Sequence, residues 1–561
     1  MPRPGKEKTS GIEYEHPGAF WFGVAAVTIG VVLHLPFYFS AADNAPLEGV
    51  GRYHLVGQTP DAAFWIGMGL ILVGLVATTY GLFPKLSTVS KGYVSRIKVR
   101  AMDDAKLSWP HIALMLTMAA AVTIDVMKPT TLAFMAPGAA VEYGLKSPLN
   151  PNAAGLPVAL YPLCGISGTV IGSFLWGWLG DKIGRRASIL IAAIIFVAVA
   201  VCGAMPVFWA NLVVCFIMGL GVGGMLPITF ALLSETIPAR HRGWVMVLIG
   251  GDIAGAYIIC SWLASTVASP EQFGWRMLWL VSLPTGLILM LLNRWIPESP
   301  RFLLQHGRED EARAIMTRYG ATVVEGEDSL LRVEKNVESR YAQLFHGPFA
   351  GLAVALLLLG VGIGMVQYGF QQWIPSNLKT LGFDDVNSAK ILRDSALIGF
   401  PLNFPIAWLY GFWSAKKTII GMAVISTTAL LGFVFAGPAQ LVVDGEATTL
   451  LHILLIVPIW GISSLTAVVI AYASEVFPTR VRARGTGLAA GATKFGGVTI
   501  LALVVAAFAT PSISNTALYG AIPLIAAIVA MSIWGVETKQ KQLERITAEE
   551  LHIGAPAGDP A

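Results

Sequence analysis

The chain has 561 residues, of which 55% are hydrophobic and 13% are charged, and its mean hydropathy is +0.66. An ordinary soluble domain carries roughly 25% charged residues, so this composition excludes a water-soluble protein of this length. The net charge of +4 is small for such a chain and gives no support to nucleic-acid binding. These values predict a polytopic membrane protein.

Apolar segments long enough to cross a bilayer recur along the whole chain. A helix that crosses the hydrocarbon core needs ~20 mostly apolar residues, and about fourteen segments meet this requirement. We therefore expect an all-α protein. The expected spans lie near residues 18–40, 62–84, 111–136, 156–180, 187–205, 210–233, 244–268, 275–296, 348–371, 391–413, 418–437, 450–473, 485–509 and 515–535.

The charges between the spans predict the orientation. Lys and Arg gather in alternate loops, whereas the intervening loops 41–61, 141–155, 206–210 and 438–449 hold few of them. Basic loops stay on the cytoplasmic side of a membrane. The alternation therefore places both termini in the cytoplasm, in a multi-pass protein of the cell (inner or plasma) membrane.

The longest polar stretch divides the later spans into two blocks of six, an arrangement found in many carriers. Within it, the segment RFLLQHGREDEARAIM predicts a short amphipathic helix on the cytoplasmic side. The expected organisation is an N-terminal tail, an extra two-helix hairpin with a basic link, an N-terminal six-helix bundle, a cytoplasmic linker, a C-terminal six-helix bundle and a C-terminal tail. Their boundaries are residues 1–17, 18–110, 111–297, 298–346, 347–536 and 537–561.

A repeated motif supports two related blocks. The pattern SExxPxRxR begins at Ser234 after the fourth span of the first block and at Ser474 after the fourth span of the second. An identical pattern at equivalent places is a strong indication of an internal repeat.

The segment GWLGDKIGRR, residues 177–186, resembles the signature of the major facilitator superfamily, and the resemblance covers residues ~111–535. The resemblance implies two six-helix bundles and a cytoplasmic latch that holds them in the outward-open state. Asp181 suits a helix N-terminus, and Arg185 and Arg186 suit pairing with carboxylates such as Glu235. The second block has Ser414 near the position of the acid, so we expect a weaker latch there. The residues expected to form the motif that controls the conformation are Gly177, Asp181, Gly184, Arg185, Arg186, Glu235, Arg242, Glu475 and Arg482.

Further segments resemble particular branches of this superfamily. The box PESPR, residues 297–301, is shared by sugar porters, organic-ion transporters and acid:proton symporters. WIPSNL, residues 373–378, and the stretch from Asp125 to Glu142 are similar to segments of the aromatic-acid and metabolite:proton symporters, whereas Gln371 and Gln372 keep the sugar porters as an alternative. The sequence departs from those symporters in having Lys128 in place of their second acid.

Charges inside the spans are the candidate binding residues, because a charge at a helix centre is costly unless it faces a cavity or a partner. Asp125 and Lys128 lie one turn apart on one helix face. We expect Asp125 to exchange a proton and Lys128 to attract a carboxylate; the alternative is a structural ion pair. The remaining candidates are Asp252, Gln367, Gln371 and Lys494.

The leading functional hypothesis is a secondary active transporter that carries a small organic anion with a proton. The alternatives are a sugar or polyol transporter and, from another class, a non-transporting membrane sensor. The chain shows no Ser/His/Asp set, HExxH or Walker motif, so we expect no enzyme activity, no cofactor and no metal. Its expected partners are the solute, protons and membrane lipids. The extra hairpin shows no motif, and lateral packing, oligomer formation and lipid binding all stay open for it.

Overall fold

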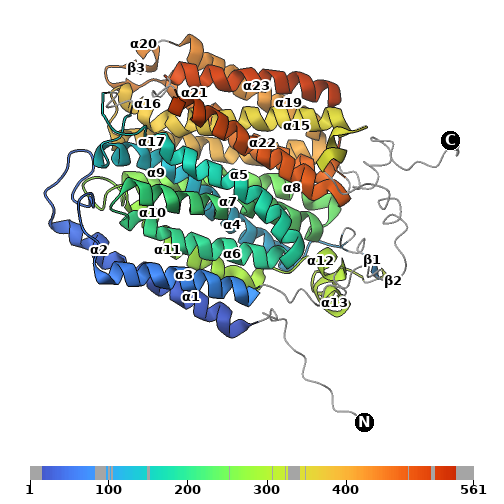
Figure 1. Cartoon of the computed structure of the whole chain (residues 1–561). Coiled ribbons are helices and arrows are strands. Elements are labelled where there is room, and N and C mark those ends of the chain that lie inside the picture. Colours follow the sequence, from blue (N-terminus) through green and yellow to red (C-terminus); the bar gives the residue numbers. More distant parts are fainter. Residues whose placement is uncertain are drawn as a thin grey trace.

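The computed structural model is a bundle of long, nearly aligned helices (Figure 1). It describes residues 16–82, 97–98, 102, 105–147, 152–251, 253–305, 308–322, 324–325, 341–347, 349–436, 438–477, 479–506 and 512–538. Within these residues, thirteen helices are long and apolar enough to cross a membrane. A further helix, α5 (Leu160–Ile183), packs against α7 and takes the place of the span expected near 156–180. The chain is therefore an all-α polytopic membrane protein, as the sequence predicted.

The first bundle contains the helices from α4 to η5. Several of its spans consist of two or three consecutive helices. Its other helices are α4 (Trp109–Glu142), α6 (Arg185–Ala198) with η4 (Val199–Ala204), α7 (Phe208–Thr236), α8 (Ala239–Gly250) with α9 (Ile253–Ser265), and α10 (Met277–Leu280) with α11 (Ser282–Leu292) and η5 (Asn293–Trp295).

The second bundle repeats this order. Its helices are α15 (Phe349–Met365) with η7 (Val366–Phe370), η8 (Gln371–Trp373) and α16 (Ile374–Thr380); α17 (Asp385–Gly399) with η9 (Phe400–Leu402), α18 (Asn403–Trp408) and η10 (Leu409–Trp413); α19 (Ala415–Phe435); α21 (Thr449–Val476); α22 (Thr479–Ala506); and α23 (Ile513–Trp534). Helices α5 and α22 pack together, as do α9 and α17, so the two bundles meet along both pairs.

The bundles have two distinct ends (Figure 1). The linker end carries α12 (Pro300–Gln305) and α13 (Glu309–Arg318), two short helices in the stretch where the sequence predicted one. Near them, β1 (Ile97–Lys98) pairs antiparallel with β2 (Val324–Glu325). The opposite end, here the distal end, carries η1 (Ser40–Asp43) and α20 (Pro438–Leu441), with β3 (Val442–Val443) paired to β4 (Glu446–Ala447).

The N-terminal hairpin consists of α1 (Pro17–Val32), α2 (Leu35–Phe39) and α3 (Ala62–Leu82), and residues 44–58 form its distal loop. Helices α1 and α3 contact α6, at the edge of the molecule far from α23 (Figure 1). Thus the extra spans pack on the side of the first bundle, one of the roles that the sequence left open.

Glycines at seven-residue spacing hold α1 and α3 close together. A Cβ at Gly30 would lie 2.7 Å from the Gly67 carbonyl oxygen, and one at Gly74 would lie 2.8 Å from the Gly23 carbonyl oxygen. A Cβ at Gly81 would also meet the backbone of α1. Small residues allow this close approach of two membrane helices. The seven-residue spacing is visible in the sequence, but the close packing of α1 and α3 was not predicted from it.

Candidate functional site

Asp125 and Lys128 on α4 and Lys494 on α22 are ionisable side chains buried within the spans. A charge at the centre of a membrane helix costs about 2.5–3.5 kcal/mol on insertion scales, so each of these groups needs polar partners. The sequence singled out all three, and their contacts define the candidate site.

The Lys494 ammonium reaches from the second bundle into the first. It donates to Ser173 Oγ on α5 at 2.8 Å and to the Gly223 carbonyl on α7 at 2.7 Å. Ser173 Oγ lies 2.8 Å from the same carbonyl. At Gly223, a side chain would overlap the Thr169 carbonyl of α5. Glycine therefore allows α5 and α7 to approach closely and leaves this carbonyl within reach of the lysine.

Lys128 lies one turn after Asp125 but turns towards α11. Its ammonium donates to Ser282 Oγ at 2.7 Å and to Thr285 Oγ1 at 3.3 Å, and it lies 5.8 Å from the centre of the Phe196 ring. An ammonium has three N–H donors. Within the described residues, Lys128 and Lys494 each use two of the three.

Asp125 is 3% exposed and lies where the two bundles meet. Lys494 and Lys128 both act electrostatically on its carboxylate, Lys494 more strongly, and the carboxylate in turn acts on Tyr368 of η7. The described contacts include no ion pair between Asp125 and either lysine. Its Oδ1 atom is buried and has no hydrogen-bond partner in the described part of the chain. This oxygen is therefore available to a proton or to a donor from a bound molecule.

The span that faces α4 from the second bundle is irregular, because α15 continues as the π-helix η7 and the 3-10 helix η8. Gln371 Nε2 donates to the Pro458 carbonyl at 2.9 Å, and the Gln371 carbonyl accepts a hydrogen bond from Tyr257 of α9 at 3.1 Å. Gln367 lies partly exposed on η7. Both expected glutamines therefore belong to the irregular part of this span.

Two further amide groups beside them were not among the expected site residues. Gln372 Nε2 and Asn377 Nδ2 are buried and have no hydrogen-bond partner among the described residues. Buried amides normally find partners. Both lie in or next to the segment WIPSNL, whose resemblance to metabolite symporters was the available signal. Asp252, the remaining expected binding residue, lies outside the described residues.

At the linker end, the segment GWLGDKIGRR forms hydrogen bonds and an ion pair with residues at the end of the first bundle. The Arg185 side chain lies 3.6 Å from Glu235 Oε1 and donates to the Gly180 carbonyl at 2.7 Å. The backbone N–H groups of Arg185 and Arg186 donate to the Glu298 carboxylate at 2.8 and 3.3 Å. The pairing expected between Arg185 and Glu235 is thus present.

Glu298, the acid of the PESPR box, caps the N-terminus of α6. Gly184 precedes this helix with φ of +96°, and a side chain there would overlap the Glu298 carboxylate. Burial raises the pKa of Glu298, while the N–H donors of Ser299 and Arg185 oppose this rise. The carboxylate lies against the positive end of the helix dipole, where an anion is stabilised.

The second bundle has an equivalent cap. The Ala415 N–H donates to Glu537 Oε1 at 2.9 Å, and the Ser414 hydroxyl donates to the other carboxylate oxygen. Glu537 follows the last span of its block, as Glu298 follows the last span of the first. Ser414 therefore stands near the position that corresponds to Asp181 in the first bundle. Glu537, which follows the final span, caps the N-terminus of α19.

Other residues of the repeated motif join the two bundles at the linker end. Glu475 accepts hydrogen bonds from Tyr410 at 2.8 Å and Thr538 at 2.9 Å, and the Arg242 charge acts on its carboxylate. Arg242 also donates to the Ile237 carbonyl at 3.4 Å. The backbones of Gly177, Asp181 and Arg482 are helical, and their side chains lie outside the described set.

Contacts between the bundles occur at successive depths along α8 and α9. Arg242 lies near Glu475, the Gly251 carbonyl accepts from Asn403 Nδ2 at 3.0 Å, and Tyr257 donates to the Gln371 carbonyl. The two halves are therefore in contact at several levels along α8 and α9.

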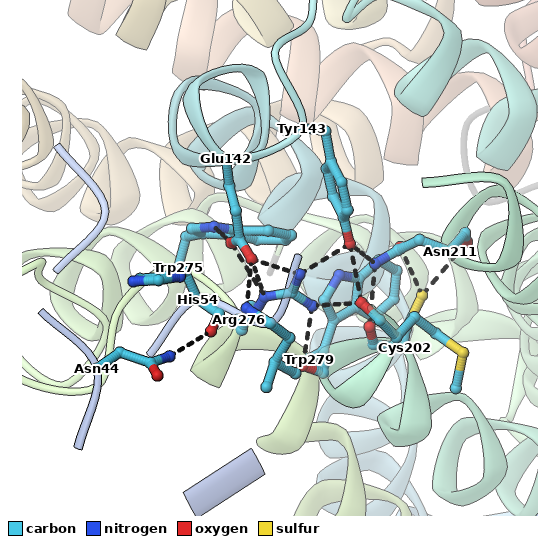
Figure 2. A network of polar contacts seen from close by, with 12 residues as sticks. Asn44, His54, Glu142, Tyr143, Cys202, Asn211, Trp275, Arg276 and Trp279 are labelled. Atoms are coloured by element: carbon cyan, nitrogen blue, oxygen red, sulfur yellow. Dashed lines mark hydrogen bonds and ion pairs between the residues drawn. The ribbon is translucent and has the colours of Figure 1, made fainter. Parts of the chain in front are cut away.

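A second buried polar network ties helices of the first bundle together towards the distal end (Figure 2). Arg276 NH2 lies 2.7 Å from Glu142 Oε1, and both side chains are at most 1% exposed. Arg276 also donates to the Met205 carbonyl at 2.7 Å and to the Tyr143 hydroxyl at 3.0 Å. The Trp275 indole donates to Glu142 Oε2 at 2.9 Å. In the sequence, Glu142 stands out only as part of the segment that resembles the aromatic-acid symporters.

Comparisons with known proteins agree with this architecture. The family model described as Major Facilitator Superfamily matches residues 111–499. The niacin transporter NiaP of Acinetobacter baylyi is 28% identical over 409 residues, covering 71% of this chain and 88% of that protein. The putative metabolite transport protein YdjK of Escherichia coli is 27% identical over 397 residues, covering 69% and 84%. Inositol transporter 4 of Arabidopsis thaliana is 31% identical over 298 residues, about half of each chain.

Solved structures show the same fold. The proton:xylose symporter XylE, bound to 6-bromo-6-deoxy-D-glucose, superposes with a TM-score of 0.63 at 19% identity and covers 78% of this chain and 98% of its own. A partially occluded inward-open structure of XylE from E. coli gives a TM-score of 0.60 at 18% identity. The family match covers well over half of the sequence, and the fold agrees with it. The chain therefore belongs to the major facilitator superfamily and is a membrane transporter, not an enzyme.

Proposed function

We propose that this transporter carries a small organic anion together with a proton by alternating access. The observation that carries the proposal is the buried cluster on α4 and α22. Asp125 has an unpartnered carboxylate oxygen among the described residues, and it interacts electrostatically with two lysines that each keep one N–H donor within the described contacts. A carboxylate on the solute is suited to accept the remaining N–H donors of these lysines, because charge-assisted hydrogen bonds are strong in a low dielectric.

The charges of the three residues explain how a proton and an anion are coupled. With Asp125 ionised and both lysines protonated, the cluster carries one positive charge. A bound carboxylate replaces Asp125 as the counter-charge of the lysines, so Asp125 then accepts a proton more readily. The cluster with anion and proton has the same net charge as the empty cluster. Both forms are therefore able to reorient, whereas either ligand alone changes the buried charge.

Lys494 has a particular place in this cycle because it joins the bundles directly. In the structure its ammonium donates hydrogen bonds to Ser173 and to the Gly223 carbonyl of the first bundle. An anion that accepts the remaining N–H of Lys494 also attracts the ammonium, which weakens its contacts with these acceptors and loosens the bundle interface. Rocking of the two halves about a central site is the general scheme for such transporters. We place the linker end and both termini in the cytoplasm, in accordance with the basic loops.

The named relatives fit either of two solute classes. Niacin, which the NiaP relative carries by name, is a pyridine carboxylate, whereas inositol and xylose are neutral. The unpartnered amides of Gln372 and Asn377 suit hydroxyl as well as carboxylate oxygens. A sugar or polyol is therefore the second candidate, but it gives no reason for two buried lysines.

Counterflow in proteoliposomes discriminates these possibilities. Purified protein is reconstituted, loaded with one unlabelled solute and given the labelled form outside. The panel contains nicotinate, benzoate, aliphatic monocarboxylates, myo-inositol and xylose. We expect exchange of at least one carboxylate, inhibited by other carboxylates. Exchange of the neutral solutes alone would favour the polyol transporter, and a chain that exchanges none of a broad panel would favour the membrane sensor.

A further inference from the structure

The distal loop of the N-terminal hairpin is docked on the first bundle. The Leu55 N–H donates to Glu142 Oε1 at 2.7 Å, and the Tyr38 hydroxyl donates to the Phe273 carbonyl. The Tyr53 ring lies 5.2 Å from the Tyr38 ring and 5.5 Å from the Phe273 ring. Leu55 and Tyr38 are fully buried. The loop is thus packed into the protein, and its backbone takes part in the buried ion pair of Glu142.

Two glycines show how closely the loop approaches the bundle. Gly51 has a φ of +86°, and a Cβ on it would overlap the Pro270 carbonyl. On the other side of the contact, Gly274 has a φ of +70°, and a Cβ there would lie 2.9 Å from the Val50 carbonyl oxygen. Any side chain at Gly51 would therefore push the loop away from the bundle.

The residues that the loop contacts lie at the end of α4 and in the segment between α9 and α10. Glu142 is the last residue of α4, and Pro270 and Phe273 lie in the segment that follows α9. Deeper in the bundle these two helices meet again, where Cys260 Sγ of α9 lies 3.7 Å from the Met127 carbonyl of α4. Met127 directly precedes Lys128. The distal loop therefore contacts the end of α4 and the segment that follows α9, and these two helices meet beside Lys128.

The charge on Glu142 makes this docking energetically significant. Its carboxylate accepts from Leu55 N–H, from the Trp275 indole and from two nitrogens of Arg276. A buried ion pair is stable only when its remaining hydrogen-bonding capacity is satisfied. Withdrawing the loop removes one donor and opens a path for water towards the pair.

We propose that the N-terminal hairpin positions the transport site, because its distal loop holds α4 and α9 in the packing that fixes Lys128. The hairpin is suited to this role, since its glycine spacing makes it a tightly packed unit and α1 and α3 also contact α6. The consequence for transport rests on the proposed function, in which Lys128 binds the anion. The packing effect itself does not depend on any substrate.

The test measures the reaction of native cysteines with N-ethylmaleimide, followed by peptide mass spectrometry on the full-length protein. Cys260 is fully buried at the α4–α9 contact, whereas Cys215 is fully buried against the Tyr161 carbonyl on α5. Labelling of a buried thiol requires local opening, so its rate reports the stability of the surrounding packing. Cys164 is partly exposed and confirms that the reagent is active.

The perturbation is Gly51→Ala, and the matched control is Gly57→Ala. Both glycines lie in the distal loop with nearly equal φ, +86° and +85°, but a Cβ at Gly57 meets nothing within 4 Å. Both variants therefore carry the same backbone strain, and Gly51→Ala alone disturbs the docking. Leu55→Pro, which removes the N–H donor to Glu142, is the second perturbation.

We expect Gly51→Ala and Leu55→Pro to increase the labelling rate of Cys260 roughly tenfold, the effect of weakening a hydrogen bond to a charged group. The rate at Cys215, and both rates in Gly57→Ala, should stay unchanged. Equal increases at Cys260 and Cys215 would show general destabilisation and overturn the proposal. Unchanged labelling of Cys260 would overturn it as well. Because no solute is used, the outcome is independent of whether the transported molecule is an anion.

Discussion

Replacing Glu142 with glutamine removes the carboxylate that pairs with Arg276. The two side chains are 1% and 0% exposed, and their closest N–O distance is 2.7 Å. The guanidinium would keep its hydrogen bonds to the Met205 carbonyl and the Tyr143 hydroxyl, but its charge would lie buried without a counter-ion. Breaking a buried ion pair from one side costs about 3–5 kcal/mol. We expect Glu142→Gln to lower the melting temperature by roughly 2–4 °C, because the entropy of unfolding grows with chain length.

The double variant Glu142→Gln/Arg276→Met, together with the single variants Glu142→Gln and Arg276→Met, forms a double-mutant cycle. Removing both charges leaves no uncompensated ion, so the double variant should be more stable than Glu142→Gln alone. The assay is thermal unfolding in detergent with a thiol-reactive fluorophore, which suits this chain because Cys202, Cys215 and Cys260 are buried. Additive effects of the two single substitutions would refute the reasoning, because additivity means that the two charges do not stabilise each other.

Two further predictions concern the bundle interface. Arg185→Gln removes the ion pair with Glu235 at the linker end, so turnover should change several-fold while equilibrium affinity for the solute stays within about twofold; a large loss of affinity in binding assays would contradict this conformational role. Lys494→Met removes two charge-assisted hydrogen bonds of 2.8 and 2.7 Å and the proposed anion contact. It should raise KM for the anion at least about tenfold, and Lys494→Arg should retain part of the affinity because the charge persists; an unchanged KM for Lys494→Met would exclude that contact.

The fold followed from the sequence because hydrophobic length is a direct physical requirement of the bilayer. The expected span near 156–180 corresponds to α5, and the span near 348–371 to α15 with its irregular extension. The extension to residue 380 was not predictable from hydropathy. Prolines and polar residues such as Gln371 end an apolar run, although the chain continues as η8 and α16 when neighbouring helices satisfy its backbone.

The candidate site was predicted only in part. Asp125, Lys128 and Lys494 could be identified from the sequence, because a charged residue inside an apolar span is costly unless it faces a cavity or a partner. The spacing of Asp125 and Lys128 predicted a shared helix face, but Lys128 turns to the hydroxyl of Ser282, about 150 residues later in the chain. The periodicity of one helix does not indicate which residues of other helices its side chains contact. For the same reason, the pairing of Lys494 with Gly223 was not visible in the sequence.

The central claim is that Asp125 couples the movement of the solute to that of a proton. The direct measurement is uptake of the carboxylate identified by counterflow, in proteoliposomes with an imposed proton gradient, by the wild type and by Asp125→Asn. The account predicts that the wild type accumulates the anion above its external concentration. Asp125→Asn should still exchange labelled for unlabelled anion but should not accumulate it. Gradient-driven accumulation by Asp125→Asn equal to that of the wild type would contradict the account.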